Sequence, residues 1–566
     1  MDTKTARPLW RLFPLALALL ALGRSLFTGL EIDEQYALSL SYRLLRGDAL
    51  FYSMWEPHQL SSLPLVPVLA LFMAVTGGTA GILLFVRVVT LLCKAGLSFL
   101  FYRAVRPCLG QTVAFWAALV LLVYTPKWFL GPDYISQQFH FTVAAFLCLW
   151  LYYSGRPAGW AALGAVCACF SFLAFPQSIF AAPVYFIGML VLDRQRRGKG
   201  AWVFLGSCVV CGLAFVAFVL RGLPLSQLVS RAMMILNDPQ YNFTTGERLA
   251  RLAAQAADVG KMLAKPALLS AVFTVGLCWR SRRRFFETWL HGFALWSVVY
   301  CLASALTDRS MDMRQYLPVL VLLGGWTFRA DRRQEENSRT RALLFWLGWL
   351  PGVAAYLMIL RSTLLGLAPT FMYLMWPAVC GVLAICLRAD SPETALRANK
   401  LCHTLLVLVF LFMVVCRVCL MMTTGWKPHA AWDTPLRQVT SGPAAGIWMD
   451  EREADRQDAL ALALEPFAGK QLLQSIGEAE GLAYLMNDGT MTVGQASVIS
   501  GTDSDPRFIA YYEELPEKLP DVVLYDKNDN RDLAEFHRWI EESLPIAQRY
   551  DVTVGTAELE VLVVNP

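Results

Sequence analysis

The segment LWRLFPLALALLALGRSLFTGL, residues 9–30, decides the fold class. It is apolar over most of its length, follows the basic residues Lys4 and Arg7, and carries Arg24 near its far end. A cleaved signal peptide ends in a small-residue cleavage site, which this segment lacks. We therefore expect an uncleaved signal anchor that crosses the plasma membrane with the N-terminus in the cytoplasm.

The composition of the whole chain agrees with a membrane location. Of the 566 residues, 56% are hydrophobic and 16% are charged, whereas a soluble protein is about one quarter charged. The chain is therefore predicted to be a polytopic α-helical membrane protein with about thirteen transmembrane helices, each long enough for roughly 30 Å of hydrocarbon. The spans are expected at residues 9–30, 80–102, 111–129, 138–153, 157–174, 176–192, 201–220, 266–280, 287–306, 315–329, 342–360, 371–387 and 401–422.

One further apolar run, residues 60–78, is interpreted differently. Pro57, Pro64 and Pro67 interrupt its start, and a run this short favours an interfacial or re-entrant helix. With that assignment the Arg and Lys clusters between spans lie on the cytoplasmic side, as the positive-inside rule requires. The net charge of +5 therefore reflects membrane topology and is no argument for a nucleic-acid partner.

The same assignment places the C-terminal part outside the cytoplasm. Residues 1–422 are expected to form a transmembrane domain with interfacial helices in 31–79, and residues 423–566 a small extracytoplasmic α/β domain. In the latter, residues 519–529 indicate a strand, residues 533–544 a helix and residues 550–566 a closing hairpin. All 14 cysteines precede residue 423, so no disulfide framework is expected there.

Two adjacent acids, Asp33 and Glu34, follow the first span. The next residues place Tyr36, Leu40 and Leu44 on one face of a helix, which is typical of an interfacial helix. The acids would then lie at headgroup depth. The plain alternative is that Asp33 only caps this helix, an ordinary use of Asp.

A second short outer loop, "FLGPDYISQQFH", carries Asp133 between two spans. Helix capping is again the plain alternative for this acid. A later outer segment, "TDRSMDMRQYLPVLVLLG", leads into a span with Arg314 and Tyr316, for which anchoring at the interface is the alternative to a role in a site.

Together these motifs resemble the GT-C superfamily of integral-membrane glycosyltransferases, especially protein O-mannosyltransferases and lipid A aminoarabinose transferases. The resemblance extends to the expected topology, and the fold is predicted to be GT-C-like. The family's Lys-Pro-Pro or His-Pro-Pro segment is replaced here by "WEPHQLSS". The matching positions are Asp33-Glu34-Gln35-Tyr36, Gly47-Asp48, Phe51-Tyr52, Glu56-Pro57-His58-Gln59, Arg87, Asp133, and Arg314, Tyr316 and Pro318.

The resemblance implies transfer of a sugar from a polyprenyl-phosphate-linked donor to an acceptor hydroxyl on the outer membrane face. The attacking hydroxyl must lose a proton, which a positioned carboxylate can take, and we expect Asp33 to be the general base of an inverting reaction without a covalent sugar intermediate. Glu34 and Asp133 would orient the acceptor or cationic partners. Residues expected to bind donor phosphate or substrate are His58, Arg87, Arg314, Tyr316 and Tyr36.

Several alternatives stay open at this point. No cofactor is expected, and a divalent ion bridging Asp33 and Asp133 is the rival use of these acids. The acceptor is a glycolipid, a wall polymer or a protein. A transporter or flippase of lipid-linked envelope precursors is the alternative function, for which the in-span charges Lys94 and Arg417 are relevant. A non-catalytic assembly protein whose C-terminal domain is a binding module is a third.

Overall fold

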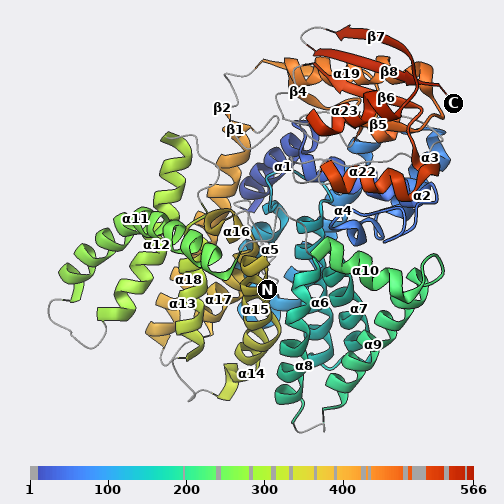
Figure 1. The fold of residues 1–566 in the computed structure, drawn as a ribbon. Helices are drawn as coiled ribbons and strands as arrows, with labels where there is room; N and C mark the ends of the chain where they lie inside the picture. The colour runs from blue at the N-terminus through green and yellow to red at the C-terminus, as the bar shows by residue number, and fades with distance from the viewer. Residues whose placement is uncertain are drawn as a thin grey trace, which may run out of the picture.

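The computed structural model describes most of the chain, and Figure 1 shows its arrangement. A bundle of helices carries the C-terminal strands at one end, next to α2, α3 and the beginning of α4. We call this the capped end of the bundle. The described residues are 11–194, 198–236, 244–278, 285–307, 314–329, 335–362, 366–387, 392–421, 429–430, 435–475, 482–486, 505–527, 534–554 and 557–565.

Within this part of the chain, 7 helical segments are long and apolar enough to cross a membrane. They are α4 (Ile82–Leu109), α9 (Lys199–Val219), α11 (Thr245–Cys278), α12 (Phe285–Thr307), Ser338–Ser362 in α14–α15, Leu367–Cys386 in α16–α17, and Ala395–Val418 in α18. Some of the basic residues that determined the predicted topology, those at 195–197, 280–284 and 330–334, lie outside the described residues, whereas Arg103, Arg106 and Arg156 lie within them.

Shorter helices account for the other predicted spans. They are α1 (Leu12–Phe27), α5 (Gln111–Val123), α6 (Tyr134–Tyr153), α7 (Gly159–Ala174), the η3–α8 run (Pro176–Leu192) and α13 (Tyr316–Arg329). Every predicted span overlaps a helix, which confirms the α-helical membrane fold, but the span predicted at 111–129 is too long, because α5 ends at Val123 and a loop follows. The main core surrounds Trp376, which packs edge-on against Phe101 and Phe146.

The lengths of two helices, α3 and α11, bear on the predicted spans. The run excluded as a span contains α3 (Val66–Thr76), whose 11 residues extend roughly 16 Å at 1.5 Å per residue, about half of a hydrocarbon core. The span predicted at 266–280 is the second half of the longer helix α11. Pro266 lies inside α11, because a proline removes one backbone hydrogen bond and bends a helix without having to end it.

The C-terminal region is an α/β layer built on a four-stranded sheet with the order β5-β6-β8-β7. Strand β5 (Leu472–Ser475) is parallel to β6 (Val522–Asp526), and β8 (Ala557–Val564) is antiparallel to both β6 and β7 (Ile546–Val554). The helices α19 (Glu451–Leu464), α22 (Asp505–Glu514) and α23 (Ala534–Ser543) complete the region. The predicted strand, helix and closing hairpin are confirmed as β6, α23 and β7–β8.

The C-terminal region shares hydrophobic cores with the loop that follows the first span. Leu38 and Tyr42 of α2 (Ile32–Leu45) pack in one cluster with Ile447 and Leu485. Since these residues come from both parts of the chain, burial of their apolar surface holds the two parts together. The division predicted at residue 422 falls at the edge of residues 422–428, which lie outside the described part.

Candidate active site

Helix α2 begins at the capped end of the bundle. Three acids at its start, Glu31, Asp33 and Glu34, each make different contacts. The cap is Glu31, whose Oε2 accepts hydrogen bonds from the backbone N–H groups of Asp33 at 2.7 Å and Glu34 at 3.0 Å. The alternative in which Asp33 caps the helix is therefore wrong. Because Glu31 satisfies the exposed N–H groups of the first turn, the Asp33 carboxylate is available for other contacts.

Asp33 points towards the loop between α5 and α6. One of its oxygens, Oδ2, forms an ion pair with the ammonium of Lys127, whose Nζ is also 3.2 Å from Oε1 of Glu31. The other oxygen, Oδ1, accepts no hydrogen bond from the described residues, and the side chain is 17% exposed. Asp33 is thus held in one orientation with one oxygen open. Neither Lys127 nor Glu31 was singled out from the sequence.

The acid Glu31 is buried close to other charges. Burial raises its pKa to about 7, the nearby acids Asp133 and Glu34 act in the same direction, and Lys127 opposes them. The cap of α2 therefore titrates near neutral pH.

Glu34 has a different partner from its neighbour. Its oxygens accept hydrogen bonds from Nε of Arg87 at 2.7 Å and from Nη2 at 2.6 Å, and both side chains are buried. Arg87 donates its other hydrogen bonds to backbone carbonyls at the end of the first span: those of Leu26, Thr28 and Gly29. Glu34 thus binds a cationic partner, which is one of the two roles expected for it, whereas the hydrogen bonds of Arg87, expected at the donor phosphate, all go to Glu34 and to these carbonyls.

Asp133 is the N-cap of α6. Its Oδ1 accepts from the backbone N–H groups of Ile135 at 2.8 Å and Ser136 at 3.0 Å, and Oδ2 accepts from the Ser136 hydroxyl at 2.6 Å. The capping alternative therefore accounts for all its polar contacts. In the described ranges no group of three or more His, Cys, Asp or Glu side chains is arranged to hold a metal ion.

His58 is enclosed by aromatic rings rather than by charges. Its ring stacks on Tyr134 with centroids 3.9 Å apart and lies 5.1 Å from the ring of Phe175. Burial lowers its pKa to about 4, so the imidazole is neutral at physiological pH. The structure therefore does not place a positive charge here for a donor phosphate. Tyr36, also predicted for the site, donates its hydroxyl to the carbonyl of Pro57, next to His58.

Arg314 lies at the start of α13 with its guanidinium carbon 4.7 Å above the ring of Trp128. It is 6% exposed, yet it has no ion pair or hydrogen bond from its side chain to any residue that the structure describes. Tyr316, two residues on, is buried and packs edge-on against Phe412 at 5.2 Å. Of these two predicted residues, Arg314 has the free donors and Tyr316 has a packing role.

Two more buried cations bind residues just before Trp128 in the chain. Lys94 of α4 donates to the carbonyl of Tyr124, and Arg417 of α18 donates to the hydroxyls of Ser25, at 3.1 Å, and Thr125. Both are almost fully buried, and neither forms an ion pair with an acid among the described residues, although Asp133 acts on the charge of Lys94 from a longer distance. The sequence had marked them only as in-span charges.

One short segment, residues 124–128, therefore joins these groups: Lys94 and Arg417 bind to it, Arg314 stacks on it, and Lys127 within it holds Asp33. Burying a cation without an anion costs several kcal/mol. We call Lys94, Arg314 and Arg417 the unpaired cations. Their arrangement is suited to an anionic group bound close to Asp33.

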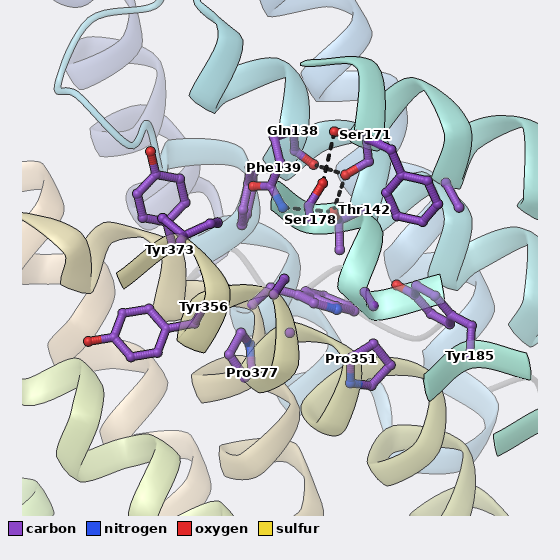
Figure 2. A pocket seen from close by; sticks show the side chains of 17 residues that line it. Gln138, Phe139, Thr142, Ser171, Ser178, Tyr185, Pro351, Tyr356, Tyr373 and Pro377 are labelled. Atoms are coloured by element: carbon purple, nitrogen blue, oxygen red, sulfur yellow. Dashed lines mark hydrogen bonds between the residues drawn. The ribbon is translucent and has the colours of Figure 1, made fainter. Parts of the chain in front are cut away.

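A pocket lies further along the bundle, between α6, α7, α8, α15 (Leu350–Ser362) and α17 (Met375–Cys386) (Figure 2). One wall is polar: Thr142 is 2.9 Å from the Ser171 hydroxyl and accepts from Gln138 at 3.2 Å. Most of the rest is aromatic or aliphatic, including Tyr373, whose ring is 5.3 Å from that of Phe175. Through Phe175 the pocket adjoins the stack around His58.

Comparisons with known proteins give structural likenesses only, because neither a family model nor a curated protein matches the sequence. The ArnT of Cupriavidus metallidurans bound to undecaprenyl phosphate matches with a TM-score of 0.39 and 13% identity, over 98% of each chain. Its apo structure matches with a TM-score of 0.38 and 13% identity, over 98% of this chain and 97% of that one.

An oligosaccharyltransferase of Archaeoglobus fulgidus, in complex with Zn and sulfate, matches with a TM-score of 0.39 and 13% identity. The match covers 90% of this chain and 68% of that one. The chain is thus similar over most of its length to solved structures of ArnT and of an oligosaccharyltransferase.

Proposed function

We propose that this chain is an inverting glycosyltransferase that moves a sugar from a polyprenyl-phosphate-linked donor to an acceptor hydroxyl, with Asp33 as general base. The observation that carries the proposal is that Oδ1 of Asp33 stays open while the unpaired cations contact residues 124–128, the same segment that holds Asp33 through Lys127. A base needs a free lone pair, and a phosphate leaving group needs positive charge that no carboxylate already neutralises.

The proposed reaction is a direct displacement. The acceptor oxygen forms a bond to the anomeric carbon, the bond from that carbon to the phosphate oxygen breaks, and the hydroxyl proton passes to Oδ1 of Asp33. Lys127 keeps the base oriented through Oδ2. The departing polyprenyl phosphate gains negative charge, which Arg314 and the other unpaired cations stabilise where it develops.

The roles of the neighbouring acids follow from their contacts. Glu34 and Asp133 are proposed to support the site, since Glu34 binds Arg87 and Asp133 caps α6. No metal is part of the proposal, because the oxygens of Asp133 already accept three hydrogen bonds. The acceptor classes remain those of the sequence analysis: a glycolipid, a wall polymer or a protein. The proposed location is a cell membrane, with the capped end outside the cytoplasm.

A second candidate, transport or flipping of a lipid-linked precursor, is favoured by one observation. Lys94 and Arg417 are buried inside helices predicted to span the membrane, and charges at such positions line transport pathways in many carriers. Both candidates bind the same class of ligand, a lipid with an anionic headgroup. They differ in whether a covalent bond is broken.

The test is reconstitution into vesicles of phosphatidylethanolamine and phosphatidylglycerol that contain a panel of polyprenyl-phosphate sugars. Radiolabelled sugar and released polyprenyl phosphate are both measured, with glycolipid, polymer and peptide acceptors supplied in turn. Glycosyl transfer predicts equal amounts of labelled acceptor and free polyprenyl phosphate. Intact donor that only changes leaflet, with no phosphate released, would instead support the transporter and contradict the proposal.

A further inference from the structure

The loop between α2 and the η2 turn (Gln59–Ser62) enters the core of the C-terminal region. We call residues 46–58 the docking loop. Its Trp55 is 2% exposed and belongs to a hydrophobic cluster whose other members include Leu473, Val523 and Leu562 of the C-terminal sheet. The Trp55 ring also packs edge-on against Tyr511 of α22, with centroids 5.1 Å apart. The Trp55 side chain, which belongs to the membrane part, is thus packed in the hydrophobic core of the C-terminal region.

Buried charges make a second connection at the same place. Lys518 of the C-terminal region forms an ion pair with Oδ1 of Asp48 in the docking loop, while Oδ2 of Asp48 accepts from Nε of Arg43 at 2.7 Å. Arg43 also pairs with Glu56 and donates to the carbonyl of Ser53 at 2.7 Å. All four charged side chains are at most 3% exposed. Two cations and two anions therefore balance each other at a buried position.

The hydrogen bonds of the docking loop extend this network. The carbonyl of Ser53 accepts a second hydrogen bond, from the Tyr511 hydroxyl at 2.8 Å. The side chain of Gln59 connects two residues of the loop: its Oε1 accepts from the Phe51 N–H at 2.8 Å, and its Nε2 donates to the Glu56 carbonyl at 3.0 Å. Phe51 has a φ of 63°, which is strained for a residue with a side chain and persists only when its surroundings hold it.

The far end of the docking loop reaches the candidate site. Glu56 is followed by Pro57, whose carbonyl accepts from Tyr36 of α2, and by His58, which has a φ of 59° and stacks on Tyr134 beside the cap of α6. A continuous set of contacts therefore runs from Lys518 through Asp48 and Arg43 to Glu56 and the stacked His58.

From this chain of contacts we propose that Lys518 is a positioning residue: it fixes the docking loop in the conformation that completes the site at the capped end. The structural part stands by itself, and its effect on catalysis rests on the proposed glycosyl transfer. The C-terminal region would then stabilise the conformation of residues 46–58 in the membrane part. Without the ammonium of Lys518, Asp48 and Glu56 would share the single charge of Arg43, and a buried acid left short of a partner disfavours the packed conformation.

The test compares amide hydrogen exchange in the full chain, in nanodiscs, for wild type, Lys518→Met and Lys518→Arg. Lys518→Met is expected to raise exchange in residues 46–58 by roughly tenfold or more, because local opening becomes easier. Exchange in β6 (Val522–Asp526) should change little. Lys518→Arg, which keeps the charge, should restore most of the protection. The control is Lys527→Met, since Lys527 pairs with Asp551 on the surface of the same region.

A second variant guards against misfolding of the first. Asp48→Asn combined with Lys518→Met removes one charge of each sign and leaves Arg43 paired with Glu56, so it should fold while still losing the tether. The proposal would be overturned if Lys518→Met and the double variant both showed wild-type exchange in residues 46–58. It would also be overturned if the double variant lost protection in β6 as well. These readouts need no enzymatic activity, so they are independent of the proposed function.

Kinetics then test the catalytic part. If the wild type transfers sugar, the double variant should lose roughly ten- to hundredfold in kcat/KM, the scale expected when a site is displaced by about 1 Å. Lys518→Arg should retain most of the rate. A double variant with an open loop and wild-type kcat/KM would contradict the link between the loop and the site.

Discussion

The carboxylate of Glu34 accepts two hydrogen bonds from the guanidinium of Arg87, at 2.7 and 2.6 Å, while the preceding residue, Asp33, faces Lys127. Successive residues of a helix point about 100° apart, so adjacent acids at the start of α2 reach different partners. One acid is fully satisfied and structural, and the other keeps an open oxygen. This division of roles underlies the predictions that follow.

Glu34→Gln is expected to destabilise the protein by about 3–5 kcal/mol, because it leaves the buried Arg87 without its anion. The measurement is thermal unfolding in detergent at neutral pH. Glu393→Gln is a matched control, since Glu393 forms an exposed ion pair with Arg397 and such pairs contribute little. If Glu34→Gln unfolded at the same temperature as the control, the structural role assigned to the pair would be wrong.

Stability should depend on pH through Glu31. Its folded-state pKa of about 7 lies above the ordinary value of 4.5, so the protonated form favours folding. This contribution is fully present below pH 4.5 and is lost as the pH rises through 7. The loss is on the order of 3 kcal/mol at about 1.4 kcal/mol per unit.

Glu31→Gln keeps an oxygen that caps α2 but removes the titration, so its stability should vary less than that of wild type between pH 4.5 and 7. Thermal unfolding across this range gives the comparison. Parallel curves for the two proteins would show that Glu31 does not titrate as described.

Arg314→Met should weaken donor binding, because the guanidinium over Trp128 is a buried cation without an acidic partner in the described chain. A hydrogen bond to a charged group contributes about 1.5–3 kcal/mol, so KM for the donor is expected to rise roughly ten- to hundredfold. Arg314→Lys should lose less, and Arg397→Met, at an exposed position, should lose nothing. An unchanged KM in Arg314→Met would remove this residue from the donor site.

Removal of divalent metal tests the rival use of the acids. Exhaustive treatment with EDTA should leave the transfer rate within about twofold of the untreated enzyme, because the oxygens of Asp133 are occupied by the α6 cap and Lys127 holds Asp33. Rates are compared before treatment, after it, and after adding back Mg²⁺ or Mn²⁺. Loss of transfer that either ion restores would favour a bridged metal site.

Most of the fold is predictable from the sequence, because the bilayer imposes a length and an apolar composition on every span. The closing hairpin β7–β8 is likewise indicated by the β-branched residues of 550–566. The continuity of α11 is less visible, since Pro266 signals a boundary in most helices but here lies inside one.

The contacts of the site are much harder to predict. Lys127 meets Glu31 across 96 positions of the chain, and no periodic pattern connects such residues. The cap of α2 lies only two residues before Asp33, a difference smaller than the usual uncertainty of a helix boundary. Arg87 has the right charge for a phosphate site, and only its buried contacts with Glu34 show that its hydrogen bonds are already used.

The most direct test of the central claim is the initial rate of sugar transfer by reconstituted Asp33→Asn, measured beside wild type with the same polyprenyl-phosphate donor. Asn is nearly isosteric with Asp but cannot take the proton, and a general base contributes about 10²–10⁴-fold. We predict a loss within that range, together with a thermal unfolding temperature close to that of wild type. Transfer by Asp33→Asn at the wild-type rate would contradict the account.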